Sequence, residues 1–128
     1  SGSQLTLKEI LIKNPLDKAI SAGEASLITG DAIQVFDGEI GIVSKDLSSV
    51  KLKDVLIENT RLGFSSFQKK SEYGKASIDI TGLSQINNES NFLIESGCRL
   101  TINNEKMPTI SSKVIEQMYG AEYGKSSK

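Results

Sequence analysis

The sequence predicts an all-β fold, a short right-handed parallel β-helix of about four to five coils with a short C-terminal capping helix. Three observations predict it. Pairs of apolar residues recur roughly every 22 residues, each period contains three such pairs, and an Asn or Asp follows the second pair. Side chains two residues apart point to the same face of a strand, so each pair indicates a short strand with one buried face.

The first strand of each coil is marked by two columns of mostly apolar residues. The first column contains Leu5, Leu27, Val50, Ile78 and Leu100, and the second contains Leu7, Thr29, Leu52, Ile80 and Ile102. One residue separates the two columns in each coil and is expected to point outward. These outward residues are Thr6, Ile28, Lys51, Asp79 and Thr101.

The second and third strands follow the same pattern. The second-strand pairs are Ile10/Ile12, Ile33/Val35, Val55/Ile57 and Ser84/Ile86, and the third-strand pairs are Lys18/Ile20, Ile40/Ile42, Leu62/Phe64 and Phe92/Ile94. An Asx column stands between them, at Asn14, Asp37, Asn59 and Asn88. An Asx side chain can satisfy backbone groups at a bend and tolerates a left-handed backbone, so this column is expected to form a structural ladder.

Three short strands per repeat describe a triangular coil, and stacked coils pair equivalent strands in parallel and in register. Aliphatic inward columns suit the buried walls of such a coil. A helical interpretation is disfavoured because the i, i+3, i+4 continuity of a helix face is missing. A leucine-rich repeat lacks support because its Leu-x-x-Leu-x-Leu pattern is absent, which leaves a β-sandwich as the other alternative.

The chain is interpreted as one domain with short additions at its ends. Residues 1–3 resemble a cloning scar, 4–110 form the β-helix, 111–120 form the capping helix and 121–128 form a flexible tail. Because no lid is apparent for the first coil, we expect the chain to be the C-terminal part of a larger protein, or to pair with another copy through this open edge.

The capping helix is predicted from its boundaries and its apolar stripe. Pro108 ends the last strand, Ser111 or Ser112 can cap a helix, and Gly120 can end it. The stripe consists of Val114, Ile115, Met118 and Tyr119. We expect this stripe to pack over the last coil as a lid.

Composition excludes several function classes. The 128 residues include 15 basic and 16 acidic side chains, a net charge of -1, which gives no basis for binding nucleic acid or an acidic membrane surface. No apolar run is long enough to cross a bilayer. With Cys98 as the single cysteine and no histidine, the sequence offers no disulfide, zinc cluster or Ser-His-Asp triad. We therefore expect no cofactor and no dedicated metal site, with Cys98 as a small buried residue.

An insertion between the third and fourth coils is one candidate binding segment. The repeat is longer between Phe64 and Ile78, and insertions in repeat folds often lie on the binding face. The inserted residues expected to contact a ligand are Gln68, Lys69, Lys70, Glu72 and Tyr73. They combine an amide, an aromatic ring and clustered charges, although a solvated loop would have a similar composition.

The outward column of the first strands is the other candidate site. Lys51 and Asp79 occupy it on adjacent coils, and any catalysis would involve these two residues and Glu72. Calcium requires six or more oxygen ligands and glycoside hydrolysis requires a carboxylate pair, whereas Asp79 stands alone in its column. The simpler interpretation is an exposed charge pair between Lys51 and Asp79.

The repeat resembles the right-handed parallel β-helices of the pectate-lyase-like superfamily over residues 4 to about 104. In that superfamily the first strand is called PB1 and an Asn ladder lies between the second and third strands. The resemblance implies that the insertion borders the outer PB1 face, where sugar-acid polymers bind. The segments IGIVSKDLSS (40–49) and FQKKSEYG (67–74) are also similar to β-helical regions of bacterial surface proteins with a CotH-type kinase domain.

These observations favour a non-catalytic structural or binding module, part of a bacterial surface or secreted protein, that presents one face to a glycan or protein partner. An extracellular or cell-surface location follows from the resemblance. Two alternatives remain: a fragment of a carbohydrate-active lyase or hydrolase, and a self-assembly element that acts through exposed coil edges.

Overall fold

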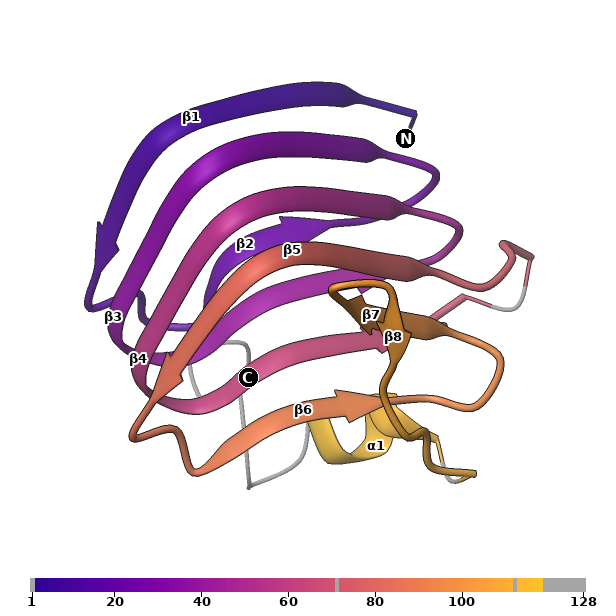
Figure 1. Cartoon of the computed structure of the whole chain (residues 1–128). Coiled ribbons are helices and arrows are strands. Elements are labelled where there is room, and N and C mark those ends of the chain that lie inside the picture. Colours follow the sequence, from indigo (N-terminus) through magenta and orange to yellow (C-terminus); the bar gives the residue numbers. More distant parts are fainter. Residues whose placement is uncertain (1, 71, 112, 119–128) are drawn as a thin grey trace.

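The chain forms a right-handed parallel β-solenoid of about four turns, which confirms the predicted fold class (Figure 1). The computed structural model describes residues 2–70, 72–111 and 113–118. The elements in chain order are β1 (Gln4–Lys13), β2 (Lys18–Ala22), β3 (Leu27–Lys45), β4 (Ser49–Phe67), β5 (Ser77–Ile86), β6 (Ser90–Ile94), β7 (Arg99–Ile102), β8 (Glu105–Lys106) and α1 (Val114–Met118).

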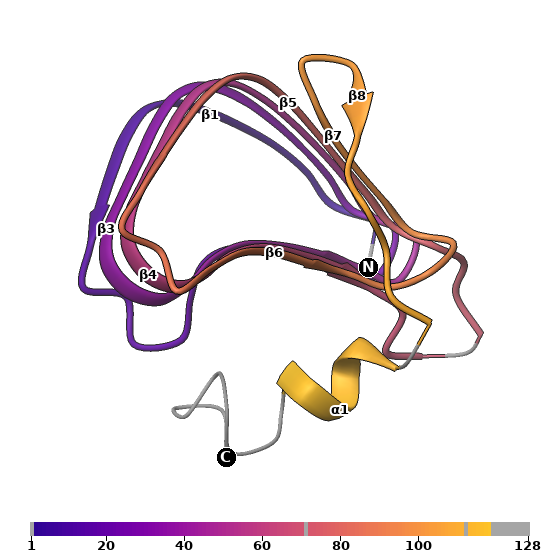
Figure 2. The ribbon, with the colours of Figure 1, turned by 60° about the horizontal axis from the view of Figure 1, so that its bottom comes forward.

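Each coil has three walls, and the coils superimpose in a view along the stack (Figure 2). In β3 the first wall is 27–31, the second is 33–36 and the third is 40–45. The other strands pair in parallel with β3 or with one another, in the order β1-β3-β4-β5-β7, and so lie on the same walls. β2 and β6 form the third walls of their coils beside β3 and β4, respectively. Residues distant in sequence therefore become neighbours on one wall.

The bends between walls repeat a left-handed backbone conformation at aligned positions. The first bend contains Glu9, Ala32, Asp54 and Gly82, and the second contains Asn14, Asp37, Asn59 and Asn87, all with φ between 54° and 75°. Such φ values are uncommon outside glycine and are tolerated best by Asn and Asp. The polar residues at the second bend are thus explained by the backbone that the bend requires.

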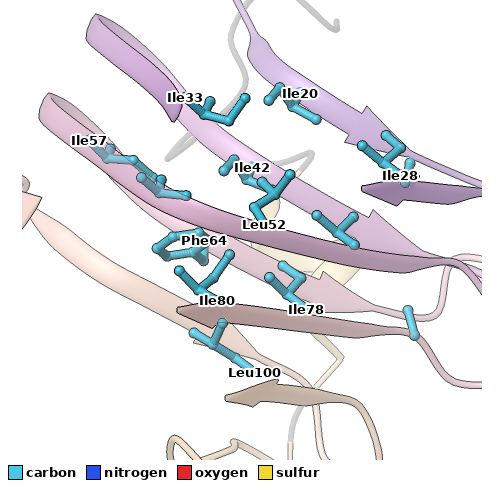
Figure 3. Packing of buried hydrophobic residues seen from close by; sticks show 14 of the residues in the cluster. Ile20, Ile28, Ile33, Ile42, Leu52, Ile57, Phe64, Ile78, Ile80 and Leu100 are labelled. Carbon is cyan, nitrogen blue, oxygen red and sulfur yellow. The ribbon is translucent and has the colours of Figure 1, made fainter. Parts of the chain in front are cut away.

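The core fills the interior of the coils (Figure 3). On the first wall, Ile28, Val50, Ile78 and Leu100 stack as one buried column. Ile33 and Val55 continue the core on the second wall, and Ile20, Ile42 and Phe64 on the third. Burial of such aliphatic columns stabilises the stack by about 1.5–3 kcal/mol for each fully buried side chain.

The second coil is shifted by one residue from the predicted register. Ile28, not Leu27, lies opposite Leu5 and Val50, and Gly30, not Thr29, lies opposite Leu7 and Leu52. The adjacent apolar residues Leu27 and Ile28 made either alignment possible. A side chain at position 30 would collide with the Leu7 carbonyl oxygen, so the inward position is held by glycine.

The fourth coil also differs from the prediction. Leu83 and Gln85 lie opposite the second-wall residues Val55 and Ile57, and Ile86 is 46% exposed instead of inward-facing. On the third wall, Ser90 lies opposite Leu62, and Phe92 lies opposite Phe64. The predicted pairs Ser84/Ile86 and Phe92/Ile94 were therefore aligned one and two residues too far along the chain.

The Asx ladder is present, but its fourth member is Asn87. The Nδ2 atom of Asn59 donates to Oδ1 of Asp37 at 3.0 Å, which links two coils at this bend. The pairing of Glu58 with Ile86 places Asn87, with its φ of 55°, next in the column. Asn88 instead accepts hydrogen bonds from the backbone and hydroxyl of Thr60, both at 2.9 Å, and donates to the Ile57 carbonyl at 3.1 Å.

The predicted C-terminal helix forms, but it does not lie over the last coil. Val114 of α1 is fully buried in a cluster with Ile40, Val43, Leu62 and Phe67, outside the coil outline on the third wall (Figure 2). The predicted pairs Ile40/Ile42 and Leu62/Phe64 are therefore split between this outer cluster and the inner core. Of the predicted stripe, the Met118 side chain and residues 119–120 lie outside the described residues, as does the predicted tail.

The last coil is instead covered by the chain that follows β7. β8 pairs antiparallel with β7, and the Met107 backbone donates to the Leu100 carbonyl at 2.9 Å. Ile110 then pairs with Glu95 beside β6.

Within the described residues, no helix has the length and apolarity needed to span a membrane.

Gly30→Ala tests the register of the second coil. The added Cβ would lie 2.6 Å from the Leu7 carbonyl oxygen, so we expect the free energy of unfolding to fall by about 1–3 kcal/mol. In Gly23→Ala, the matched control, the Cβ meets only the flexible Lys45 side chain, and the change should stay within about 0.5 kcal/mol. Equal stabilities in urea denaturation would contradict the inward position of residue 30.

Candidate functional site

The outer face of the first wall carries a polar column that crosses every coil. Its members are Thr6, Thr29, Lys51, Asp79 and Thr101. Thr29 takes the place that the sequence assigned to Ile28, which is 5% exposed and belongs to the core. Thr6 and Thr29 hydroxyls lie 3.3 Å apart, so neighbouring members of the column are in contact.

Asp79 is bound on two sides by residues of the next coil. Its Oδ2 accepts from Nη2 of Arg99 at 3.0 Å, and its Oδ1 accepts from the Thr101 hydroxyl at 2.6 Å and from Nε of Arg99 at 3.3 Å. This is a two-pronged guanidinium–carboxylate contact, a geometry that holds both planes fixed. Lys51 lies opposite Asp79 as predicted, but Arg99 forms the ion pair.

The surroundings of Asp79 keep it ionised. Its partial burial raises the carboxyl pKa, but the hydrogen bonds from Arg99 and Thr101, with the charges of Arg99 and Lys51, outweigh burial and leave the pKa below its usual value. A carboxyl group in this state is a poor proton donor at neutral pH. Asp79 therefore suits a fixed structural charge better than a general acid.

A shallow depression lies beside this carboxylate. It has a volume of about 380 Å³ and is lined by Thr29, Gly30, Lys51, Leu52, Lys53, Asp79 and Thr81. Lys51 and Lys53 are exposed, and neither ammonium group makes a hydrogen bond or ion pair with the residues that the structure describes. Because Arg99 neutralises Asp79, the depression presents a net positive surface.

The third bend of a coil joins its third wall to the first wall of the next coil. Asp46 lies in the third bend between β3 and β4, and the inserted loop forms the third bend between β4 and β5. Backbone groups of the loop hold it against the bend that contains Asp46. Oδ1 of the buried Asp46 accepts from the backbone of Lys69 at 2.7 Å and of Lys70 at 2.8 Å. The Gln68 backbone donates to Glu95 at 3.1 Å, and the Gln68 side chain donates to the carbonyls of Lys70 and Tyr73. The described residues of the loop are therefore held by contacts within the loop and by contacts to Asp46 and Glu95, which its composition alone did not indicate.

Lys70 reaches back across the stack to Glu24, with which it forms an ion pair. The hydrogen bond between them, followed by their opposite charges, lowers the pKa of Glu24 and raises the pKa of Lys70. Both side chains are partly exposed, so the pair contributes little to stability. Nevertheless, Lys70, which was predicted to contact a ligand, forms its ion pair with Glu24 of the same chain.

The structure thus separates the predicted site residues into two groups. Lys51 and Asp79 share the outer first wall, whereas Gln68, Lys69, Lys70, Glu72 and Tyr73 belong to the loop at the third bend. Three residues that bind the predicted site residues were not identified from the sequence. Arg99 binds Asp79, Asp46 binds the backbone of the loop, and Glu24 binds Lys70. Arg99 could have been found, because it directly precedes the Leu100 column, but the contacts of Asp46 and Glu24 depend on how the loop folds back.

The acidic side chains and the Cys98 thiol bear on metal binding and on thiol chemistry, respectively. The described part of the chain contains no cluster of three or more Cys, Asp or Glu side chains that could hold a metal ion. Cys98 is buried, and burial raises the pKa of its thiol. A buried thiol with a raised pKa is a weak nucleophile.

Asp79→Asn is expected to lower stability at neutral pH. Because the folded-state pKa is depressed, the ionised carboxylate stabilises the fold above its unfolded-state pKa of about 3.9, and this stabilisation is lost as the pH falls through the lower folded value. Urea denaturation at pH values from 7 downward measures the free energy of unfolding. The difference in this free energy between wild type and variant should become smaller in acid.

Asp31→Asn provides the matched control on the same wall. Asp31 is exposed and makes no side-chain hydrogen bond with the described residues, so its replacement should change stability by less than about 0.5 kcal/mol. A gap for Asp79→Asn that widened in acid would refute the assignment of Asp79 as a stabilising carboxylate.

No protein-family model, no curated protein and no solved structure matches this chain. The strand register of this chain establishes the parallel solenoid, and the likeness of its repeat to the pectate-lyase-like superfamily stays a prediction.

Proposed function

We propose that this chain is a non-catalytic structural and binding module whose outer first wall takes an anionic glycan. The supporting observation is the pair of exposed lysines, Lys51 and Lys53, which stand without hydrogen-bond partners in the described chain over a depression beside an already neutralised carboxylate. Two exposed cations on the same face of one strand suit the carboxylates of a uronic-acid chain.

The shape of the surface fits the same ligand class. An extended polysaccharide contacts a wall of strands along its length. The paired hydroxyls of Thr6 and Thr29 can exchange hydrogen bonds with sugar hydroxyls, whereas the Thr101 hydroxyl donates to Asp79. The proposed resemblance to the pectate-lyase-like superfamily points to the same outer face. A cell-surface or secreted parent protein, such as the CotH-type proteins, would bring such a module to extracellular glycans.

The enzymatic alternative has less support. A lyase or hydrolase would need carboxylates available for a metal or for proton transfer. Asp79 has both carboxylate oxygens engaged by Arg99 and Thr101. Glu72 belongs to the loop at the third bend, so the two carboxylates do not share a wall.

Lysine-to-glutamine variants test the binding proposal. Lys51→Gln and Lys53→Gln should each weaken binding of oligogalacturonides about fivefold or more, because each removes a charge-assisted contact. Lys113→Gln, which removes the same charge near α1, should leave affinity unchanged. Isothermal titration calorimetry at low and high salt measures the effect, and salt should weaken wild-type binding.

Two results would reject the glycan as ligand. The first is absence of oligogalacturonide binding to the wild-type chain. The second is an equal loss of affinity in Lys113→Gln, which would assign the effect to net charge and not to the first wall.

Self-assembly is a second candidate function, favoured by the state of β1. This strand pairs only with β3 among the described elements, and its inward residue Leu5 is 51% exposed, whereas the equivalent Ile28 is 5% exposed. An edge strand with uncovered apolar residues can pair with another strand. A second copy could therefore complete the core at this end.

The sequence of β1 is self-complementary about the first bend. If two copies paired antiparallel there, Leu5 would face Ile12, Leu7 would face Ile10, and Lys8 would face Glu9. Apolar inward residues would then meet, and opposite charges would lie across from each other twice, which is a favourable cross-strand arrangement.

A charge swap tests this pairing. Lys8→Glu should shift the equilibrium toward monomer because two acidic side chains would then face each other, and Lys8→Glu/Glu9→Lys should restore the dimer. Sedimentation equilibrium over a range of concentrations gives the mass. A strictly monomeric wild-type chain, or a swap that fails to rescue, would exclude the antiparallel edge dimer.

A further inference from the structure

The outer face of the second wall carries a different set of side chains from the first. Two outward columns cross it, one with Leu11, Gln34, Leu56 and Ser84, and one with Lys13, Phe36, Glu58 and Ile86. Phe36 is half-buried, and its neighbours on the adjacent coils are Lys13 and Glu58. An outward-facing aromatic ring is thus framed by a cation and an anion.

This face is hollowed along its width. Three depressions share Gln34: one reaches the first bend at Glu9, one extends beside Leu56, and one of about 390 Å³ lies over Phe36 and reaches the second bend. The strand from residue 32 to 37 spans about 17 Å at the usual rise per residue. The surface is therefore a shallow trough long enough for a short linear oligomer.

Polar groups in the trough are available to a ligand. The side chains of Lys13, Gln34 and Glu58 make no hydrogen bond or ion pair within residues 2–70, 72–111 and 113–118. On the first wall, by contrast, Asp79 is engaged by Arg99 and Thr101. The trough thus combines an apolar ring with one donor, one acceptor and one amide that have no partner in the described structure.

We propose that this trough binds a neutral oligosaccharide, with Phe36 as the platform for one sugar ring. A pyranose has an apolar C–H face that packs on an aromatic ring and a rim of hydroxyl groups that both donate and accept. Lys13 donates to such hydroxyls, Glu58 accepts from them, and Gln34 does both. Leu11 and Leu56 extend the apolar floor beside Gln34.

Charge favours a neutral sugar over an anionic one at this position. Glu58 and Asp37 both line the depression over Phe36, against the single cation Lys13. The acidic excess repels a uronic acid, which the lysines of the first wall would attract. The two walls therefore select different glycans, and this site stands independently of the first-wall proposal.

Amide chemical-shift titration tests the site. The ¹⁵N-labelled chain is titrated separately with cellohexaose, mannohexaose and xylohexaose, and at least one should shift amides 34–37 and 56–59. Phe36→Leu keeps an apolar side chain but removes the ring, so it should weaken that binding about threefold to tenfold. Glu58→Gln keeps the shape and should also weaken binding. Ile86→Ala, on the same wall but outside the lining of the trough, should not.

Clear outcomes overturn the proposal. Absence of shifts at these amides with every neutral hexasaccharide up to about 10 mM would do so, since a useful site reaches at least millimolar affinity. Unchanged oligosaccharide binding by a folded Phe36→Leu variant would also overturn the proposal. Shifts confined to residues 51–53, with oligogalacturonide as the stronger ligand, would assign all glycan binding to the first wall and reject the trough.

Discussion

The structure depends on in-register stacking of coils whose backbone turns at the same positions. Left-handed residues recur at the first bend from Glu9 to Gly82 and at the second from Asn14 to Asn87, so each coil changes direction where its neighbour does. Only then do the inward columns superimpose and exclude water together. A β-solenoid coil buries little by itself, and most of its stabilisation comes from contact with the next coil. The repeat is therefore both the unit of sequence and the unit of stability.

The same stacking decides which residues can act together on the surface. Asp79 is a full coil away in sequence from Arg99 and Thr101, but the three form one hydrogen-bonded group on the first wall. Lys13, Phe36 and Glu58 come from three coils and lie side by side on the second. The two groups differ in one respect that matters for binding. The carboxylate of the first group is satisfied within the chain, whereas the polar groups around Phe36 are left to solvent or to a ligand.

The periodicity of the sequence was sufficient to predict the fold but not the register of every coil. The parallel strands and the first, third, fourth and fifth members of the Leu5 column follow directly from the spacing of apolar residues. Two of the errors occurred where two neighbouring residues were equally suitable, Leu27 beside Ile28 and Asn87 beside Asn88. In both cases the backbone geometry determines the register. Glycine is required at position 30 because the Leu7 carbonyl oxygen approaches closely, and Asn87 is the residue with the left-handed φ. The docking of α1 on the third wall depends on contacts between Val114 and distant strands that no local pattern encodes.

The composition of the insertion did not reveal how its backbone is held. Its amide, ring and cations resemble a binding loop, yet Asp46 buries a carboxylate to hold the Lys69 and Lys70 backbones, and Gln68 closes the loop on itself. Burying a carboxylate is costly, and among the described residues only Oδ1 of Asp46 accepts hydrogen bonds, whereas its buried Oδ2 has no partner. The loop is thus best understood as the element that closes the third bend where the repeat is longest. We propose that ligands bind instead on the walls, where regular strands hold side chains at a fixed spacing that a repeating sugar polymer can match.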